Sequence, residues 1–213
     1  MQIAVVLFPR VTALDAIGPY EVLQRLPGVE IVFVGEQAGE VRTENGFLGL
    51  TVDATFAEVP APEVVVVPGG VGSRAVAVED SAVVQWLRGV HPTTRLTTSV
   101  CTGSLILAAA GLLDGLTATT HWSVYDLLKK KGAVPVEQRV VEHLEQRLIT
   151  AAGVSAGIDM ALRLSELLFD ADAARAMQLM VEYDPQPPFD AGSASKAGPA
   201  VMARAAEYAK TKQ

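Results

Sequence analysis

Residues 95–113 read RLTTSVCTGSLILAAAGLL, and this stretch decides the fold. It begins as an apolar and β-branched run from Leu96 to Val100, which is typical of a buried strand. Small and apolar residues follow at once and end at Gly111, which predicts a helix directly after the strand. Cys101, the only cysteine of the 213 residues, falls at the junction. The pattern therefore predicts a strand, a sharp turn and a helix, with a cysteine nucleophile elbow at the bend.

A cysteine at such a bend is expected at the carboxyl end of a strand, with its side chain exposed beside the first backbone N–H groups of a helix. The helix dipole favours negative charge there. Unpaired N–H groups can also receive charge that develops on a bound substrate. Both effects favour a reactive Cys101 thiolate. The alternative is a cysteine that serves only as a small buried hydrophobic residue.

Strand-like and helical segments alternate along the rest of the chain. The runs 2–8 and 63–68 are continuously apolar, as strands buried on both faces of a parallel sheet are. The expected strands are 2–8, 29–35, 63–68, 96–100, 116–120, 134–136, 139–141 and 147–150, and the expected helices include 81–90, 126–131, 158–169, 172–182 and 200–210. Without repeats or a linker, this order predicts one α/β domain over residues 1–213. We expect a three-layer αβα sandwich with a mostly parallel, flavodoxin-like central sheet and a ligand site at the carboxyl ends of its strands.

Composition limits the partners. Seventeen basic and twenty-four acidic residues give a net charge of −7, and the only basic run is Lys129–Lys131, so nucleic acid and anionic membrane surfaces are not expected partners. No apolar run approaches the roughly 20 residues that span a bilayer, and the N-terminus has no basic leader. We therefore expect a cytoplasmic protein.

Neither a metal nor a cofactor is implied. A single cysteine excludes an internal disulfide, and the three histidines are scattered at His91, His121 and His143. Gly69 and Gly70 directly follow the strand at 63–68, but the third glycine of a dinucleotide fingerprint is missing. Gly70 could instead supply an N–H group to an anion hole shared with Cys101; the alternative is a plain turn.

Asp15 lies near the start of an apolar, roughly helical segment that ends at Pro27 and Gly28. Its ordinary explanation is a helix N-cap or a first-turn acid. Pro19 fits only the first turn of a helix, so the segment before it is expected to be an irregular loop that carries Asp15 into a cleft.

Several segments resemble the ThiJ/PfpI superfamily, which has the class I glutamine amidotransferase-like fold. They are VVVVPGG (64–70), TSVCTGSLILAAAGLLDGLTATTHW (98–122) and ITAAGVSAGIDMALRLSELL (149–168). Within it, LDAIGPYEVL (14–23), SVCTGS (99–104), ATTHW (118–122) and EYDPQPPFDAGS (182–193) are similar to the bacterial isonitrile hydratases. Hydrolase-like members place histidine after the elbow cysteine, whereas Thr102 stands here, as in the hydratases. Asp15 matches their N-terminal aspartate.

The resemblance implies a hydro-lyase that adds water to an organic isonitrile and forms an N-substituted formamide. Cys101 would attack the isonitrile carbon and form a thioimidate, while Asp15 positions or delivers a proton. Thr102 and Gly70 would receive developing negative charge through their N–H groups. The resemblance also implies a homodimer.

Three further residues are candidates for the substrate pocket: Ile17, His121 and Trp122. Ile17 and Trp122 would serve equally well in a core. His121 could relay a proton or line the site, and the alternative is a histidine held by hydrogen bonds beneath the sheet.

Two other functions compete with the hydratase. A glyoxalase-like or amidase activity would use the same thiolate but would want a base beside Cys101. A redox or ligand sensor, like the sensor modules fused to AraC-type regulators, would bind or react without turnover. Such regulators carry a DNA-binding extension, and no basic helix-turn-helix is expected here. A stand-alone thiol sensor remains an alternative.

Overall fold

The computed structural model describes residues 1–210 and divides the chain into two compact units, Met1–Val181 and Glu182–Gln213. The single domain over 1–213 stays a prediction.

The strands are β1 Gln2–Val6, β2 Glu30–Gly35, β3 Gly39–Arg42, β4 Gly49–Val52, β5 Ala54–Thr55, β6 Val64–Val67, β7 Leu96–Val100, β8 Thr117–Ala118, β9 Val134–Pro135, β10 Val140–His143 and β11 Leu148–Ala151. The α-helices are α1 Ala13–Leu23, α2 Ser73–Val76, α3 Ala82–Val90, α4 Ser104–Ala109, α5 Tyr125–Lys130, α6 Ala156–Leu168, α7 Ala171–Met180 and, in the second unit, α8 Pro199–Lys210; 3-10 turns lie at η1 Phe56–Glu58, η2 His91–Thr93, η3 Cys101–Gly103 and η4 Trp122–Val124.

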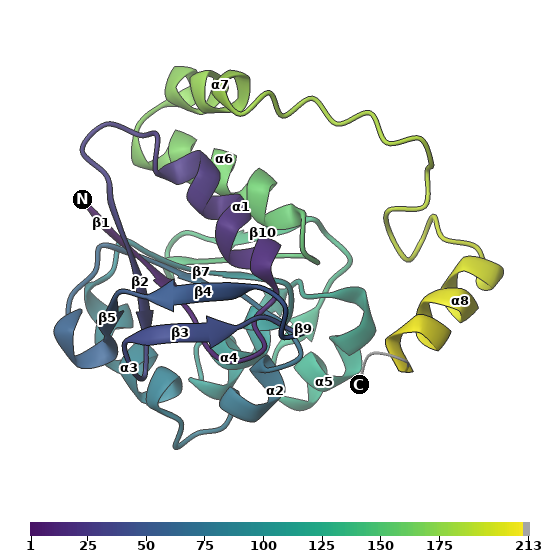
Figure 1. Cartoon of the computed structure of the whole chain (residues 1–213), viewed down its shortest axis with the longest axis horizontal. Coiled ribbons are helices and arrows are strands. Elements are labelled where there is room, and N and C mark those ends of the chain that lie inside the picture. Colours follow the sequence, from purple (N-terminus) through teal and green to yellow (C-terminus); the bar gives the residue numbers. More distant parts are fainter. Residues whose placement is uncertain (211–213) are drawn as a thin grey trace. The chain divides into compact units, whose positions relative to one another are not determined.

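The first unit is built on a seven-stranded sheet with the strand order β10-β11-β7-β6-β1-β2-β5. All neighbouring strands in it are parallel except β10 and β11, which are antiparallel. Helices α1 and α6 pack on one face with α7 against α6, and α2 to α5 lie on the other (Figure 1). The predicted α/β sandwich with a mostly parallel sheet is confirmed.

The central strands are covered on both faces. Every residue of β6 and β7 is buried, as are Ile3 to Val6 of β1. This is why their sequences are runs of apolar and β-branched residues rather than alternating ones. Ser81, at the start of the helix expected over 81–90, caps α3, since its hydroxyl accepts a hydrogen bond from the Val84 N–H (3.4 Å).

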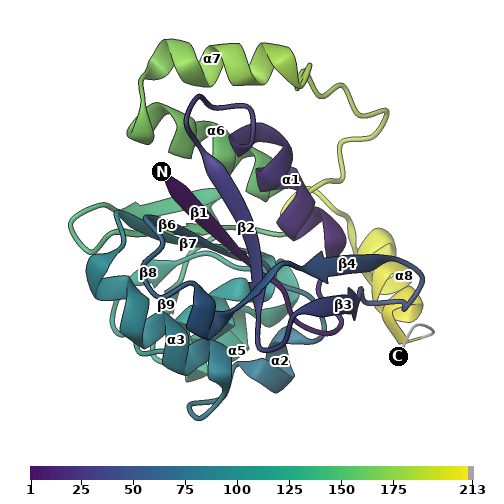
Figure 2. The same ribbon diagram turned by 60° about the vertical axis from the view of Figure 1, so that its left-hand side comes forward.

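Outside this sheet, β3 and β4 form an antiparallel hairpin (Figure 2). Gly46 lies at its tip with φ +77, a conformation that glycine adopts at little cost. The dipeptide Asn45-Gly46 is typical of tight hairpin turns, and a hairpin is present here.

The strand register brings three turns to one edge of the sheet. Val67 of β6 is paired with Ser99 of β7, and Val100 of β7 with Ala151 of β11. Parallel strands in this register end together, so the turns that follow them meet at one edge. The turns are Pro68–Gly70, Cys101–Gly103 and Ala152–Val154.

The structure corrects the expectation for the first helix. Helix α1 begins at Ala13, includes Asp15 in its first turn and contains Pro19 in its interior, so no irregular loop precedes Pro19. Packing explains the proline: α1 lies against α6, and a Cβ on Gly157 of α6 would be only 3.2 Å from Pro19 Cγ. Tertiary contact outweighs the local cost of a proline in the helix.

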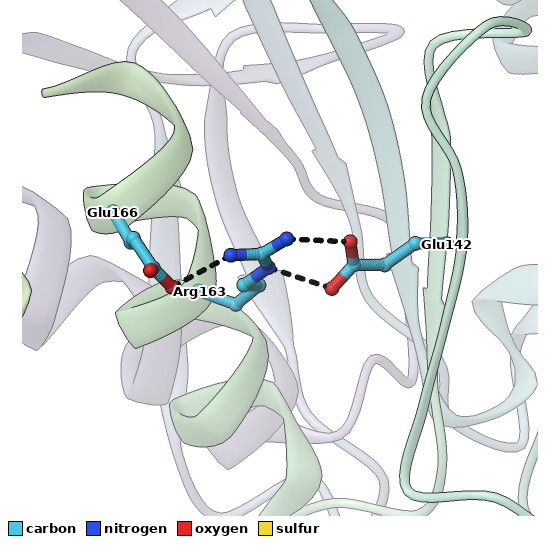
Figure 3. A network of polar contacts seen from close by, with 3 residues as sticks. All are labelled: Glu142, Arg163 and Glu166. Atoms are coloured by element: carbon cyan, nitrogen blue, oxygen red, sulfur yellow. Dashed lines mark hydrogen bonds and ion pairs between the residues drawn. The ribbon is translucent and has the colours of Figure 1, made fainter. Parts of the chain in front are cut away.

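The antiparallel edge strand is tied to α6 by one arginine (Figure 3). The Arg163 guanidinium donates to both carboxylate oxygens of Glu142 on β10, at 2.8 and 3.0 Å, and to Glu166 one turn away, at 2.6 Å. Bidentate pairs of this kind fix orientation as well as distance. The network anchors β10 beneath α6.

No helix within residues 1–210 is long and apolar enough to cross a bilayer. Across the same residues, no group of three histidine, cysteine, aspartate or glutamate side chains is arranged to hold a metal ion.

Candidate active site

Cys101 occupies a strained backbone position directly after β7. Its φ is +58, a left-handed value that is uncommon for a residue other than glycine. Three contacts fix it there: its N–H donates to Ala152 O (3.0 Å), and its carbonyl accepts from the hydroxyls of Thr120 (3.0 Å) and Ser104 (3.3 Å). Strain held by surrounding contacts is typical of functional sites. The predicted elbow is present.

The cysteine side chain is buried, contrary to the expectation that the elbow exposes it. Cys101 is 4% exposed, because the turn at Gly69 packs directly against the elbow: a Cβ on Gly69 would lie 2.4 Å from Thr102 N. Burial raises the pKa of the thiol well above its usual value of 9.0, and the charge of Asp15 raises that pKa further. Helix position alone therefore does not give a thiolate.

Two backbone N–H groups act against this rise. The N–H groups of Val154 and Thr102 both hydrogen-bond to the sulfur and lower the pKa of the thiol. Val154 is itself strained, with φ +43 in a β-branched residue. Its place after β11 turns the N–H toward Cys101. Sequence analysis missed Val154, since nothing in AAGVSAG marks a valine in a left-handed conformation.

Asp15 lies beside the cysteine, although 86 residues separate them in the sequence. It is fully buried in the first turn of α1, and its Oδ2 accepts a hydrogen bond from the Gly69 N–H (2.9 Å). Its other oxygen, Oδ1, is buried and makes no hydrogen bond of ordinary geometry to any described residue. Asp15 is a first-turn acid, as one ordinary reading had it, but it is not the N-cap, which is Thr12, and its burial gives it an environment that a helix end alone would not.

The proton affinity of Asp15 is unusual. Burial raises the pKa of its carboxyl from 3.8 to about 7, against the lowering effects of the Gly69 N–H and of the Cys101 side chain. The charge of Glu44 raises this pKa further. A carboxyl group with this pKa can give and take protons at neutral pH.

Asp15 and Cys101 titrate as a pair, because each changes the pKa of the other. Near pH 7 the pair loses its first proton and then holds one. That proton can be on sulfur, leaving Asp15 ionised, or on Asp15, leaving a thiolate. The N–H groups of Val154 and Thr102 stabilise the second arrangement, which is the nucleophilic one.

Thr102 ties the elbow to the neighbouring turn. Its hydroxyl accepts from the Gly70 N–H (2.8 Å) and the Ser73 hydroxyl (2.9 Å), and donates to Gly70 O (3.1 Å). A hydroxyl has one donor and two acceptor positions, so this one is fully used. The Gly70 N–H is likewise engaged and would have to leave Thr102 before it could contact a substrate.

Gly69 and Ser73 also lie at this site; the sequence analysis named Gly69 only as part of the glycine turn after the strand at 63–68 and did not single out Ser73. Gly69 holds Asp15 through its N–H and has no room for a side chain, since a Cβ would lie 2.4 Å from Thr102 N and 3.0 Å from Asp15 Oδ2. The fully buried Ser73 supports the Thr102 hydroxyl. The sequence signal for both was the GGVGS motif after a buried strand.

His121 and Trp122 lie near this edge of the sheet. Burial lowers the pKa of the half-buried His121, so its imidazole is mainly neutral at pH 7. Its Nδ1 is 2.7 Å from the Ser123 hydroxyl, and its ring packs on Gly153, next to Val154. The Trp122 ring lies 5.2 Å from that of His121 and is 37% exposed. Their roles as pocket walls stay predictions.

Neither His121 nor Ile17 makes a hydrogen bond to the reactive pair among residues 1–210. Ile17 is half-buried on α1, two residues beyond Asp15, and residues at that spacing do not share a helix face. Its role in substrate binding stays a prediction.

A buried cysteine at a strand-to-helix elbow, beside an acid from the first helix of an αβα sandwich, defines the class of protein. The DJ-1/PfpI family model matches residues 1–167, and the chain belongs to this family. It is a homologue of the isonitrile hydratase of Pseudomonas putida, with 44% identity over 209 residues that cover 98% of this chain and 90% of the other.

Two further relatives are similar. A ThiJ/PfpI family protein from Pseudomonas syringae superposes with a TM-score of 0.91 at 39% identity, covering 99% of this chain and 86% of the other. The HTH-type transcriptional regulator GbdR of Pseudomonas aeruginosa is 28% identical over 181 residues, which are 83% of this chain but only 48% of the regulator.

Proposed function

We propose that the protein is an isonitrile hydratase, a hydro-lyase that converts an organic isonitrile and water into an N-substituted formamide. The observation that carries the proposal is the buried Asp15 carboxyl beside the Cys101 sulfur, with a pKa of about 7. The similarity over nearly the whole chain to the P. putida isonitrile hydratase supports the choice of substrate. No histidine follows Cys101 in the sequence, since Thr102 stands there, which disfavours amidase or glyoxalase-like chemistry.

In the first step, the Cys101 thiolate attacks the terminal carbon of R–N≡C and a carbon–sulfur bond forms. The same carbon must gain a proton, and Asp15 donates it. The product is the thioimidate R–N=CH–S–Cys101, and Asp15 becomes a carboxylate. One buried acid thus balances the charge of the attack.

In the second step, water adds through its oxygen to the thioimidate carbon. One of its protons ends on the nitrogen and the other on Asp15. The carbon–sulfur bond then breaks, which releases R–NH–CHO and restores the thiolate and the protonated acid. The Val154 and Thr102 N–H groups stabilise the departing thiolate as they do the attacking one.

A reduced thiol is required throughout, which fits a cytoplasmic location, where thiols stay reduced. We also propose that the protein acts as a homodimer, as the family resemblance implies. Light scattering of the purified protein tests the second proposal, and a monomer at micromolar concentration would contradict it.

Incubation with cyclohexyl isonitrile tests the activity. We expect the native protein to form N-cyclohexylformamide, detected by mass spectrometry, and Cys101→Ser to form none. In water enriched in oxygen-18, the label should enter the formamide oxygen, because that oxygen comes from water. No formamide from native protein whose Cys101 is verified as reduced would refute the proposal.

A further inference from the structure

The turn after β6 presents successive N–H groups to side chains from different elements. The Gly69 N–H donates to Asp15 of α1 (2.9 Å), and the Gly70 N–H donates to Thr102 of the elbow (2.8 Å). The position of the acid relative to the elbow thus depends on how this turn is held.

A third side chain holds the next N–H group. Oε1 of Glu44, from the connection between β3 and β4, accepts a hydrogen bond from the Val71 N–H (3.0 Å). The Glu44 backbone is fixed in turn, since its N–H donates to Val11 O (3.2 Å) just before α1. Within residues 1–210, Glu44 forms no ion pair with a cation. The hairpin therefore places a carboxylate, without a cationic partner among these residues, on the turn whose Gly69 N–H holds Asp15.

The charge of Glu44 reaches the reactive pair. This charge raises the pKa of Asp15. It also raises the pKa of His121, although burial lowers that pKa by more. The charged groups that act on Asp15 are Glu44 from the hairpin and Cys101 from the elbow, and both are anionic when ionised. The charge of Glu44 favours a proton on Asp15, as the charge of a Cys101 thiolate would, whereas the neutral Cys101 thiol lowers the pKa of Asp15 through its hydrogen bond.

We propose that Glu44 is a positioning residue of this site: it anchors the turn that holds Asp15, and its charge shifts the single proton of the pair towards Asp15 and away from Cys101. The second part follows because the negative charge of Glu44 acts on Asp15, whereas the charge that acts on the sulfur is that of Asp15, so Glu44 disfavours the arrangement with ionised Asp15. The population of the reactive arrangement, in which Asp15 is protonated and Cys101 is a thiolate, increases as a result. Its consequence for turnover rests on the proposed function.

Two substitutions separate the roles of charge and hydrogen bond. Glu44→Gln keeps an oxygen acceptor for the Val71 N–H and removes the charge, whereas Glu44→Ala removes both. Glu40→Gln is the matched control, because Glu40 carries the same charge on β3 of the same hairpin but pairs with Arg42.

The measurement is thiolate absorbance at 240 nm from pH 5 to 9, with Cys101→Ser subtracted. Since Cys101 is the only cysteine, the difference reports this sulfur alone. We expect Glu44→Gln to lower the thiolate signal at pH 8 about threefold at 10 mM salt, and the loss to shrink at 0.5 M salt, where exposed charges are screened. Glu40→Gln should leave the thiolate signal unchanged. In the turnover assay, Glu44→Ala should lower kcat further than Glu44→Gln does, because it also removes the hydrogen bond to the Val71 N–H, and KM should change little.

Three results would overturn the inference: a thiolate signal in Glu44→Gln equal to that of the native protein at low salt, an equal loss in Glu40→Gln, or no thiolate in the native protein up to pH 9. The spectroscopy needs no isonitrile. If the thiolate depends on Glu44 but no formamide forms, the role of Glu44 stands and the isonitrile proposal fails. If formamide forms but the thiolate does not depend on Glu44, the isonitrile proposal stands and the role of Glu44 fails.

Discussion

Two polar centres of this molecule are built on opposite principles. On the edge strand β10 and helix α6, Arg163 is partly exposed and bound by two carboxylates, Glu142 and Glu166 (Figure 3). At the elbow, Asp15 is fully buried and receives one N–H group, from Gly69, and no cation of the described residues 1–210 acts on it. In the first centre a cation pairs with anions, and in the second the acid has no partner of opposite charge among residues 1–210.

The difference fixes what each centre can do. The hydrogen bonds that Arg163 donates to the two carboxylates raise its pKa still further above its usual range, so its charge is permanent. Burial brings the pKa of Asp15 to about 7, so its proton is exchangeable in the physiological range. A compensated centre holds two elements together, whereas an uncompensated buried acid is a candidate for proton transfer.

Changing an acid to its amide in each centre gives the largest expected contrast. Asp15→Asn removes the proton donor and should lower formamide production about 1,000-fold, within the range of general acid catalysis. Glu142→Gln makes the same chemical change and should leave turnover within about twofold, as surface changes usually do. Both variants should keep the native circular dichroism spectrum. Retained turnover in Asp15→Asn would reduce Asp15 to a structural role.

The pH dependence of stability should also separate the two centres. Folded Asp15 binds its proton more tightly than unfolded Asp15, so its contribution to stability is complete below pH 3.8 and is lost as the pH rises toward about 7. A pKa raised from 3.8 to about 7 corresponds to at most about 4 kcal/mol.

Urea unfolding of the native protein and of Asp15→Asn measures this effect. The free energy of unfolding of the native protein should fall relative to the variant between pH 4 and pH 7 and then run parallel to it. Glu142→Gln should show no such fall. Parallel curves for native protein and Asp15→Asn over the whole range would mean that the Asp15 carboxyl is not perturbed.

Gly69→Ala tests the packing over the elbow. Its Cβ would lie 2.4 Å from Thr102 N, a backbone atom that cannot move freely. We expect the free energy of unfolding to fall by about 2–3 kcal/mol and turnover to fall with it. Gly89→Ala is the matched control: it lies in α3 with open space around it, and should stabilise the protein by about 0.5–1 kcal/mol. Equal stabilities of the two variants would contradict the close contact.

The smallest effect is expected at the compensated centre. Arg163→Met removes the ion pairs that tie α6 to β10 and should lower the free energy of unfolding by about 1 kcal/mol, because these pairs are partly exposed. Turnover should not change. A loss of turnover larger than the loss of stability would show that the two centres are coupled through α6.

Sequence patterns predicted local features well where one segment contains the whole cause. The buried strand before Cys101, the hairpin at Asn45-Gly46 and the cap at Ser81 follow from short-range rules. The same rules failed at Pro19, because its place inside α1 depends on Gly157 of another helix.

The sequence by itself determined the αβα sandwich and the position of the only cysteine at the end of β7, because side-chain periodicity and turn chemistry are local properties. Only the tertiary structure decided that this cysteine is buried and that Asp15 lies beside it, held by an N–H group 54 residues away. It alone brought the Val154 N–H to the sulfur and the charge of Glu44 to Asp15. Proton affinity depends on burial and on neighbouring charges, and both are set by segments that meet only in the folded chain.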